Sequence, residues 1–221
     1  MKVFLLHAMP LDERMWSPQL PALAEYEVET PNLYDLGGSS IDEWAEKLLE
    51  RIEGNLAVVG ASIGGYVALA MARRAPERVK GLMLVGSRAA DDPPERKAAR
   101  EEALRTLDEG GLEAWAPNAP APPPAERTVD EVKRAIVALR DRRDHSDVAR
   151  SFDGPLWVAV GDGDPFTPLD EARGIAEHAK SGRLEVFEGV GHFPSLDRPE
   201  RFNELLREFL AEAASRRPPD T

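Results

Sequence analysis

The chain has 221 residues, of which 42% are hydrophobic and 31% are charged, and its formal net charge is −12 at pH 7. These proportions predict one globular domain, and the acidic charge argues against nucleic acids and anionic membranes as partners, because both are polyanions. Cysteine is absent and the four histidines are scattered, which excludes disulfides and thiolate metal sites and leaves no metal-ligand spacing. No apolar run reaches the roughly 18 residues of a membrane span. The apolar run at the start of the sequence stops at His7 and lacks the cleavage site of a signal peptide, so we expect a strand there and a cytoplasmic protein.

The first part of the chain alternates short apolar strands with helices. We expect strands over residues 3–6, 26–30, 56–59 and 80–86. A helix is predicted after Ser40, because Ser40 and Glu43 have the capping-box spacing and an apolar stripe follows at helical period. Another helix follows the third strand and ends before Pro76. This alternation indicates a mostly parallel sheet of about six strands with helices on both faces.

The alternation stops after Ser87. Residues 88–151 contain no convincing strand, but a weakly amphipathic stretch precedes a proline-rich segment at 117–124. A second helix is predicted from Thr128, which has capping-box spacing with Glu131 and precedes an apolar stripe. The stripe argues against a disordered linker. We therefore expect a core formed by residues 1–87 and 152–221, with residues 88–151 as a helical insertion.

The sheet is predicted to resume over residues 155–160 and to end with a strand over 184–187. Between these strands, Thr167 and Pro168 are suited to the N-cap and first position of a helix. A final amphipathic helix is expected around residues 202–210. The polar end, residues 215–221, is expected to fray.

The third strand leads into Gly60-Ala61-Ser62-Ile63-Gly64, which places Gly-x-Ser-x-Gly at a strand-to-helix corner. This pattern is typical of a nucleophile elbow, in which a serine is held on a sharp, strained turn. We expect Gly60 and Gly64 to omit Cβ atoms where strand and helix approach closely. The helix that begins here directs free N–H groups at an anion forming on the substrate.

Two later strand-end loops add an aspartate and a histidine. Asp164 follows the fifth predicted strand and His192 follows the sixth, so the three candidates occur in the order Ser62, Asp164, His192. Loops that follow parallel strands leave the sheet at the same edge, so the side chains can converge. We expect His7, in the loop after the first strand, to hold neighbouring backbone.

These motifs resemble those of the α/β-hydrolase superfamily over nearly the whole chain. Residues 7–10 are similar to its His-Gly-x-Pro loop, and residues 31–39 to its Pro-Asp-Leu…Gly-x-Ser stretch. Residues 75–79, 161–164 and 191–192 are similar to the segment after its elbow helix and to its acid and histidine loops. The resemblance implies the α/β-hydrolase fold with a short helical cap, and it selects Asp164 over Asp162 as the acid. Serine at position 62 separates the chain from the dehalogenase branch, which uses aspartate, and the dienelactone branch, which uses cysteine.

Two positions depart from that family. Ala8 replaces the usual glycine, so we expect a methyl group where the backbone approaches the catalytic centre. Asn32 replaces the usual aspartate, which we expect to alter how the neighbouring loop is held. Neither change removes a catalytic group.

The resemblance implies a small esterase- or lactonase-like serine hydrolase without a cofactor or metal. Ser62 would attack the carbonyl, His192 would transfer the proton, Asp164 would orient His192, and the N–H groups of Met9 and Ile63 would form the oxyanion hole. We expect a small to medium neutral ester or lactone as substrate and a monomer or homodimer. Some residues could line an apolar pocket, although the pattern favours ordinary core packing at least as strongly for each of them: Trp16, Leu112, Trp115, Phe166 and Phe193.

Other functions remain open on the same motifs. Hydroxynitrile lyases, carbon–carbon bond hydrolases and cofactor-free perhydrolases of this fold use the same three residues. A non-catalytic receptor for a small ligand is less favoured, because all three catalytic residues are present.

Overall fold

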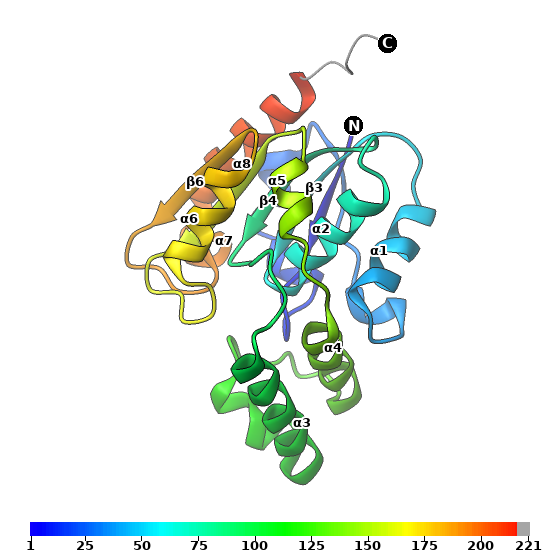
Figure 1. The fold of residues 1–221 in the computed structure, drawn as a ribbon, viewed down its shortest axis with the longest axis vertical. Coiled ribbons are helices and arrows are strands. Elements are labelled where there is room, and N and C mark those ends of the chain that lie inside the picture. Colours follow the sequence, from blue (N-terminus) through cyan, green and yellow to red (C-terminus); the bar gives the residue numbers. More distant parts are fainter. Residues whose placement is uncertain (216–221) are drawn as a thin grey trace.

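The structure is a computed structural model that describes residues 1–215. The tail in which we expected fraying lies outside the described residues except for Ser215, which ends a helix. Six strands form one sheet in the order β2-β1-β3-β4-β5-β6, and every neighbouring pair is parallel (Figure 1). The strands are β1 (Lys2–Leu6), β2 (Glu27–Glu29), β3 (Leu56–Ala61), β4 (Val79–Val85), β5 (Leu156–Gly161) and β6 (Gly182–Phe187). The sheet is therefore wholly parallel.

The register of the central strands aligns their carboxyl ends. Leu6 of β1 lies beside Gly60 of β3, and Gly60 lies beside Leu84 of β4. Val85 of β4 lies beside Ala159 of β5. The loops that follow these four strands consequently leave the sheet at one edge, where ligands bind in open α/β sheets.

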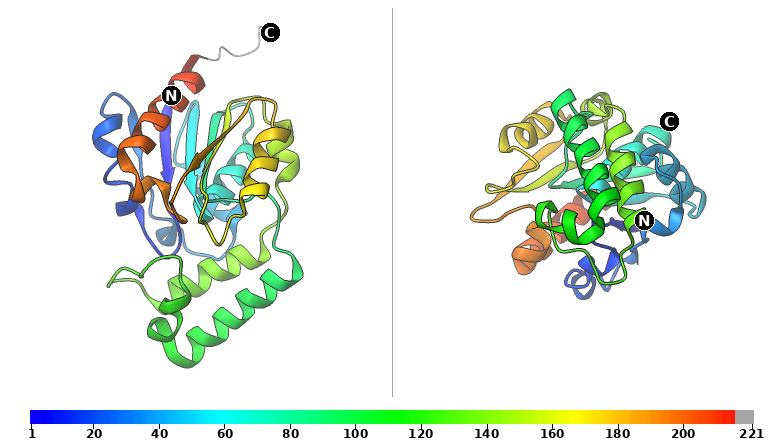
Figure 2. Two further views of the ribbon diagram at one scale, coloured as in Figure 1. Left: turned by 90° about the vertical axis from the view of Figure 1, so that its left-hand side faces the viewer. Right: turned by 90° about the horizontal axis from the view of Figure 1, so that it is seen from below.

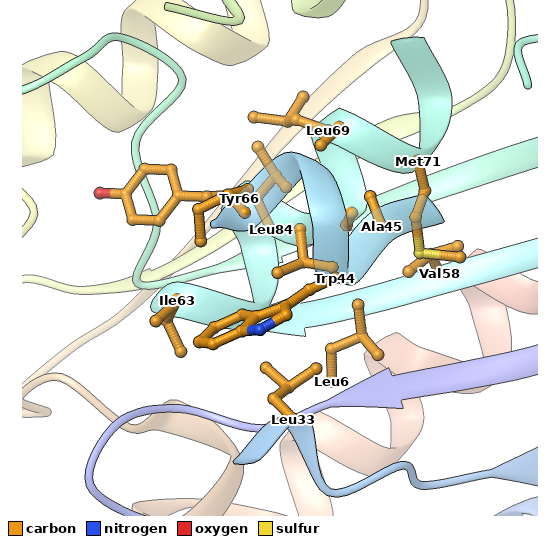
Figure 3. Close-up of a cluster of buried hydrophobic side chains, with 14 of the residues drawn as sticks. Leu6, Leu33, Trp44, Ala45, Val58, Ile63, Tyr66, Leu69, Met71 and Leu84 are labelled. Carbon is orange, nitrogen blue, oxygen red and sulfur yellow. The ribbon is translucent and has the colours of Figure 1, made fainter. Parts of the chain in front are cut away.

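Helices cover both faces of the sheet (Figure 2). One face is covered by α1 (Ile41–Glu50), α2 (Ile63–Arg74), α5 (Ser146–Ser151) and α6 (Leu169–His178). The other is covered by α7 (Pro194–Asp197), α8 (Pro199–Ser215) and the 3-10 turns η1 (Glu13–Trp16) and η2 (Leu20–Leu23). Figure 3 shows part of the first face, where Trp44 of α1 packs between Leu33 and Ile63. Its indole N–H donates to the carbonyl of Gly37 at 2.7 Å.

Local signals determine where the helices begin. Ser40 caps α1 by accepting the N–H of Glu43 at 3.4 Å, as the sequence predicts. The prediction for α6 was wrong by one residue, since the helix begins at Leu169 and Pro168 is its N-cap. Thr167 instead belongs to the loop that surrounds Asp164, where its N–H donates to Asp164 Oδ1 at 3.2 Å.

Residues 88–151 contain no strand, and their first two helices stand beyond the carboxyl edge of the sheet (Figures 1 and 2). These are α3 (Pro94–Trp115) and α4 (Val129–Asp141), which pack against each other. The predicted capping box is present, because Thr128 Oγ1 accepts the N–H of Glu131 and Glu131 Oε2 accepts that of Thr128. Gly111, with φ of 65°, interrupts α3, and the turns η3 (Leu33–Leu36) and η4 (Ala116–Asn118) complete the fold.

The short helix α5 has a different position from α3 and α4. It packs against α2 and α6 on the face of the sheet, although it lies within the expected insertion. The part that overhangs the sheet edge therefore consists of α3, α4 and their connections.

Candidate active site

Ser62 lies at the corner between β3 and α2. With φ of 49° and ψ of −112°, it is the one non-glycine residue among residues 1–215 with a positive φ. A Cβ on Gly60 would lie 2.3 Å from the carbonyl oxygen of Gly64, and one on Gly64 would lie 2.3 Å from that of Leu6. Any side chain at either glycine would displace backbone, so the corner depends on both. Strain of this kind is concentrated at functional sites.

Asp164 and His192 meet at the ends of β5 and β6. His192 Nδ1 lies 2.8 Å from Asp164 Oδ2, and both side chains are buried. The second carboxylate oxygen accepts the N–H groups of Phe166 at 2.8 Å and Thr167 at 3.2 Å. A carboxylate that accepts at Nδ1 keeps the proton there and leaves Nε2 free as a base.

Asp162, the alternative acid, has a separate position. Its Oδ1 accepts the N–H of Gly189 at 2.8 Å, so it joins the loop after β5 to the loop after β6. Of the two aspartates, Asp164 is the one that contacts His192, and its role as the acid stays a prediction.

Ser62 and His192 line the same cavity, which has a volume of about 510 Å³ and lies between the sheet edge and helices α3 and α4. Among the described residues, no hydrogen bond joins Ser62 Oγ to His192. Such bonds are often long in ligand-free enzymes and shorten when substrate binds. The cavity brings the elbow and the aspartate–histidine pair to one space.

Two aromatic rings and one glycine hold His192 in place. The ring of Phe166 packs edge-on against it at a centroid distance of 5.0 Å, and Phe193 packs at 4.7 Å. A Cβ on Gly86 would lie 3.0 Å from His192 Nδ1. The imidazole therefore has little freedom to turn away from Asp164.

The loop after β1 carries one of the two expected oxyanion donors. Met9 lines the cavity, and its N–H has no hydrogen-bond partner within residues 1–215. Ile63 is the first residue of α2, so its N–H has no acceptor within the helix. Both groups are available to bind an oxyanion, although their roles remain a prediction.

His7 holds the backbone of this loop through hydrogen bonds, as the sequence predicts. Its Nε2 accepts the N–H of Leu33 at 2.8 Å, and Nδ1 donates to the carbonyl of Ala8 at 3.1 Å. Burial lowers the pKa of His7 to about 4, so the ring is neutral near pH 7. A neutral ring can donate at one nitrogen and accept at the other.

The two departures from the family pattern are accommodated locally. We expected the methyl group of Ala8 near the catalytic centre, but it packs in the hydrophobic cluster under η1 and α8 and does not line the cavity. Ala8 N–H also contacts the sulfur of Met15 in η1 at 3.2 Å, which joins this residue to the same cluster. Asn32 Oδ1 accepts the N–H of Tyr34 at 3.1 Å, so the asparagine caps η3.

The expected pocket residues divide into two groups. Trp115 and Phe166 line the cavity, whereas Trp16, Leu112 and Phe193 do not. Trp16 is fully buried on the face of the sheet that α8 covers, with its ring 6.2 Å from that of Phe202. Leu112 follows the Gly111 kink and packs on the hydrophobic core, and Phe193 reaches the site only through its contact with His192.

Several lining residues were missed by sequence reasoning. They come from the start of α2, the inner faces of α3 and α4 and the loop after β5: Tyr66, Arg96, Arg100, Thr106, Ile136, Leu139 and Thr167. The apolar stripe of α4 was visible in the sequence. Periodicity does not tell whether a stripe faces a core or a cavity, so the assignment needed the tertiary structure.

Neither a metal site nor a membrane helix is present in the described part of the chain. Among residues 1–215, no group of three histidine, aspartate or glutamate side chains could hold a metal ion. None of the helices in this range is both long enough and apolar enough to cross a bilayer.

Comparison with known proteins agrees with this geometry. Residues 3–205 match the alpha/beta hydrolase family. The chain belongs to this family. It is 30% identical to the pimeloyl-[acyl-carrier protein] methyl ester esterase of Aromatoleum aromaticum, with 93% of this chain and 96% of that protein aligned. The 2-hydroxymuconate semialdehyde hydrolase of Pseudomonas sp. (strain CF600) is 27% identical, with 90% and 81% aligned.

A solved structure shows the same similarity. The thermophilic esterase of Thermogutta terrifontis, determined with malate bound, has a TM-score of 0.85 and 27% sequence identity. The superposition covers 96% of this chain and 90% of that protein. This alpha/beta hydrolase family member is thus an esterase-type hydrolase, as the sequence predicts.

Proposed function

We propose that the protein is a serine hydrolase that cleaves a small to medium carboxylic ester or lactone through an acyl-enzyme. The observation that carries this proposal is the 2.8 Å contact between His192 Nδ1 and Asp164 Oδ2, together with the cavity that His192 and Ser62 both line. The esterase relatives support it. Helices α3 and α4 form the cap over the site.

Acylation begins when the substrate carbonyl lies beside Ser62 Oγ. His192 Nε2 takes the hydroxyl proton as Oγ bonds to the carbonyl carbon, and Asp164 stabilises the resulting imidazolium. The negative charge moves to the carbonyl oxygen, which accepts hydrogen bonds from the N–H groups of Ile63 and Met9. One such donor typically contributes about 3 kcal/mol to transition-state stabilisation.

The tetrahedral intermediate then collapses. The bond to the leaving alcohol breaks, and His192 returns the proton to its oxygen. In the second half-reaction His192 removes a proton from water, which attacks the acyl carbon, and Ser62 leaves with a proton restored to Oγ. The net reaction is ester plus water to acid plus alcohol.

The decisive test uses Ser62→Ala. Wild-type protein should hydrolyse a p-nitrophenyl or methyl ester and should be labelled at Ser62 by a fluorophosphonate. Ser62→Ala should lose both, because the nucleophile is absent. Wild-type turnover by Ser62→Ala would refute the mechanism.

Carbon–carbon bond cleavage is a second candidate, because a 2-hydroxymuconate semialdehyde hydrolase is among the relatives. That enzyme and an esterase can share one set of catalytic residues, so substrate turnover distinguishes them. Incubation with 2-hydroxymuconate semialdehyde and with a methyl ester panel would separate the two. Faster turnover of the semialdehyde would favour the second candidate.

A further inference from the structure

The cavity wall formed by α3 carries two arginines, Arg96 and Arg100. They are unexpected there because the protein has a net charge of −12 and the predicted substrate is neutral. Excess positive charge in the cavity of an acidic protein concentrates anions at that place. The question is whether neighbouring carboxylates already neutralise the two guanidinium groups.

Arg100 shares its carboxylate with two other arginines. Asp92 is fully buried and lies 2.8 Å from Arg142, 3.2 Å from Arg100 Nε and 3.5 Å from Arg88. Arg88 also contacts Glu171, so three guanidinium groups face two carboxylates and one positive charge remains. Arg142 is fully buried and Arg88 nearly so, whereas the Arg100 side chain is 26% exposed. The surplus charge is thus accessible at Arg100.

The terminal nitrogens of Arg100 have no hydrogen-bond acceptor within residues 1–215, because only Nε contacts Asp92. Its guanidinium is therefore anchored on one side and free to donate on the other. The anchor reduces the conformational entropy that a long side chain loses when it binds a ligand.

Arg96 adds a second charge without a carboxylate partner. Its NH1 group donates to the carbonyl of Phe166 at 2.9 Å, which places it beside the ring that packs on His192. No carboxylate lies within 4.0 Å of its guanidinium among the described residues. Arg96 therefore contacts the loop beside the aspartate–histidine pair and, within residues 1–215, has no carboxylate next to its guanidinium.

The one carboxylate residue of α3 that lines the cavity does not cancel these charges. Glu102 accepts from Arg105 Nε at 3.0 Å, and its side chain is 66% exposed. Arg105 and Glu102 form a solvent-exposed pair on α3, so this carboxylate already has a cation.

We propose that Arg96 and Arg100 form an anion subsite that binds a free carboxylate on the substrate, so that the preferred substrates are monoesters of dicarboxylic acids. This inference rests on the proposed esterase function and defines its substrate class. Arginine forks match the planar geometry of a carboxylate. The ester group then lies toward Ser62 and the acid group toward α3, and both lie within one cavity.

The kinetic test compares monomethyl esters of linear dicarboxylic acids, succinate through suberate, with methyl alkanoates of equal chain length. At the preferred length, wild-type kcat/KM should be at least about ten-fold higher for the acid ester, mainly through a lower KM. Arg96→Gln and Arg100→Gln should each reduce this ratio at least about five-fold. Arg105→Gln is the matched control on the same helix, and its ratio should equal that of wild type.

A binding experiment separates the subsite from the chemistry. The dicarboxylates succinate through suberate should bind the Ser62→Ala protein in calorimetry, and Arg96→Gln in that background should weaken binding at least about five-fold. Binding without turnover of any ester would refute the proposed function and retain the subsite. The subsite would be overturned if kcat/KM for the acid ester did not exceed that for the methyl alkanoate at any chain length. It would also be overturned if this ratio stayed unchanged in folded Arg96→Gln and Arg100→Gln. Tighter binding of inorganic phosphate than of any dicarboxylate would also overturn it.

Discussion

The clearest prediction for single residues is that Asp164 and Asp162 differ in how much activity depends on them. Asp164→Asn should lower kcat at least about 100-fold, because asparagine no longer stabilises the imidazolium and can favour the wrong tautomer. Asp162→Asn should retain most activity, since Asp162 accepts only the N–H of Gly189. Steady-state kinetics on one ester, with thermal melts to verify folding, provides the measurement. Equal large losses in both variants would mean that loop geometry determines the rate.

Two tryptophans offer a matched comparison of pocket and core. Trp115→Leu should change the preference among ester chain lengths by about 1–3 kcal/mol, because Trp115 lines the cavity. Trp16→Leu should leave that preference unchanged and lower the free energy of unfolding by about 2–4 kcal/mol, because Trp16 is completely buried. Kinetics on acetate through octanoate esters and urea denaturation test both. A preference change in Trp16→Leu would contradict the assignment.

For single residues, the sequence predicted the position of those that belong to local motifs. Ser62, Asp164 and His192 follow strands, so their position at the sheet edge is a consequence of chain connectivity. The burial of Trp16 away from the cavity could not be predicted in this way, because it depends on packing between η1 and α8, which are far apart in the sequence. Arg100 was missed for the same reason, since its shared carboxylate is visible only in three dimensions.

At the level of elements, Arg127 joins the cap to the loop that carries Met9. It precedes α4, donates to the carbonyl of Pro10 at 3.1 Å, lies 3.4 Å from Asp12 and stacks over the ring of Tyr34 at 3.7 Å. Because Pro10 follows Met9, this contact couples the cap position to the proposed oxyanion hole. The residue is nearly buried, so the contact is shielded from solvent.

Arg127→Met should therefore lower the free energy of unfolding by about 2 kcal/mol. It should also lower kcat more than it raises KM, because the methionine keeps the apolar stem but loses the bond to Pro10. Arg14→Met is the control, since Arg14 also contacts Asp12 but is 58% exposed, and its loss should cost less than about 1 kcal/mol. Urea denaturation and steady-state kinetics would test both. Equal effects of the two substitutions would show that Arg127 has no special role.

The elements themselves were largely predictable, because buried parallel strands appear as continuous apolar runs and capped helices have local start signals. The start of α6 was missed by one residue, because Thr167 belongs to the loop whose N–H groups hold Asp164, a contact that the sequence pattern does not show. The packing of α5 on α2 and α6 was not predictable, because six residues carry too little periodicity to indicate a face.

The stability of the whole molecule in acid should depend on two buried histidines, His7 and His145. Burial lowers the pKa of His7 to about 4, and burial together with the charge of Arg73 lowers that of His145 to about 4. The ordinary value in an unfolded chain is about 6.5. Between these values the unfolded chain binds protons that the folded protein excludes, so stability is present above pH 6.5 and is lost as the pH falls toward 4.

When the pH falls from 6 to 5, the contribution of each histidine should therefore lower the free energy of unfolding by about 1 kcal/mol. Ordinary carboxylates titrate little in this range. Urea denaturation at several pH values in this range should give a shallower pH dependence for His7→Gln and for His145→Gln than for wild type. His178→Gln is the control, because His178 is exposed. Since His7 supports the loop of Met9 and His145 contacts Arg73 at the far end of α2, the two sites are separate and their effects should add. A double variant with the wild-type slope would show that neither histidine accounts for the loss of stability in acid.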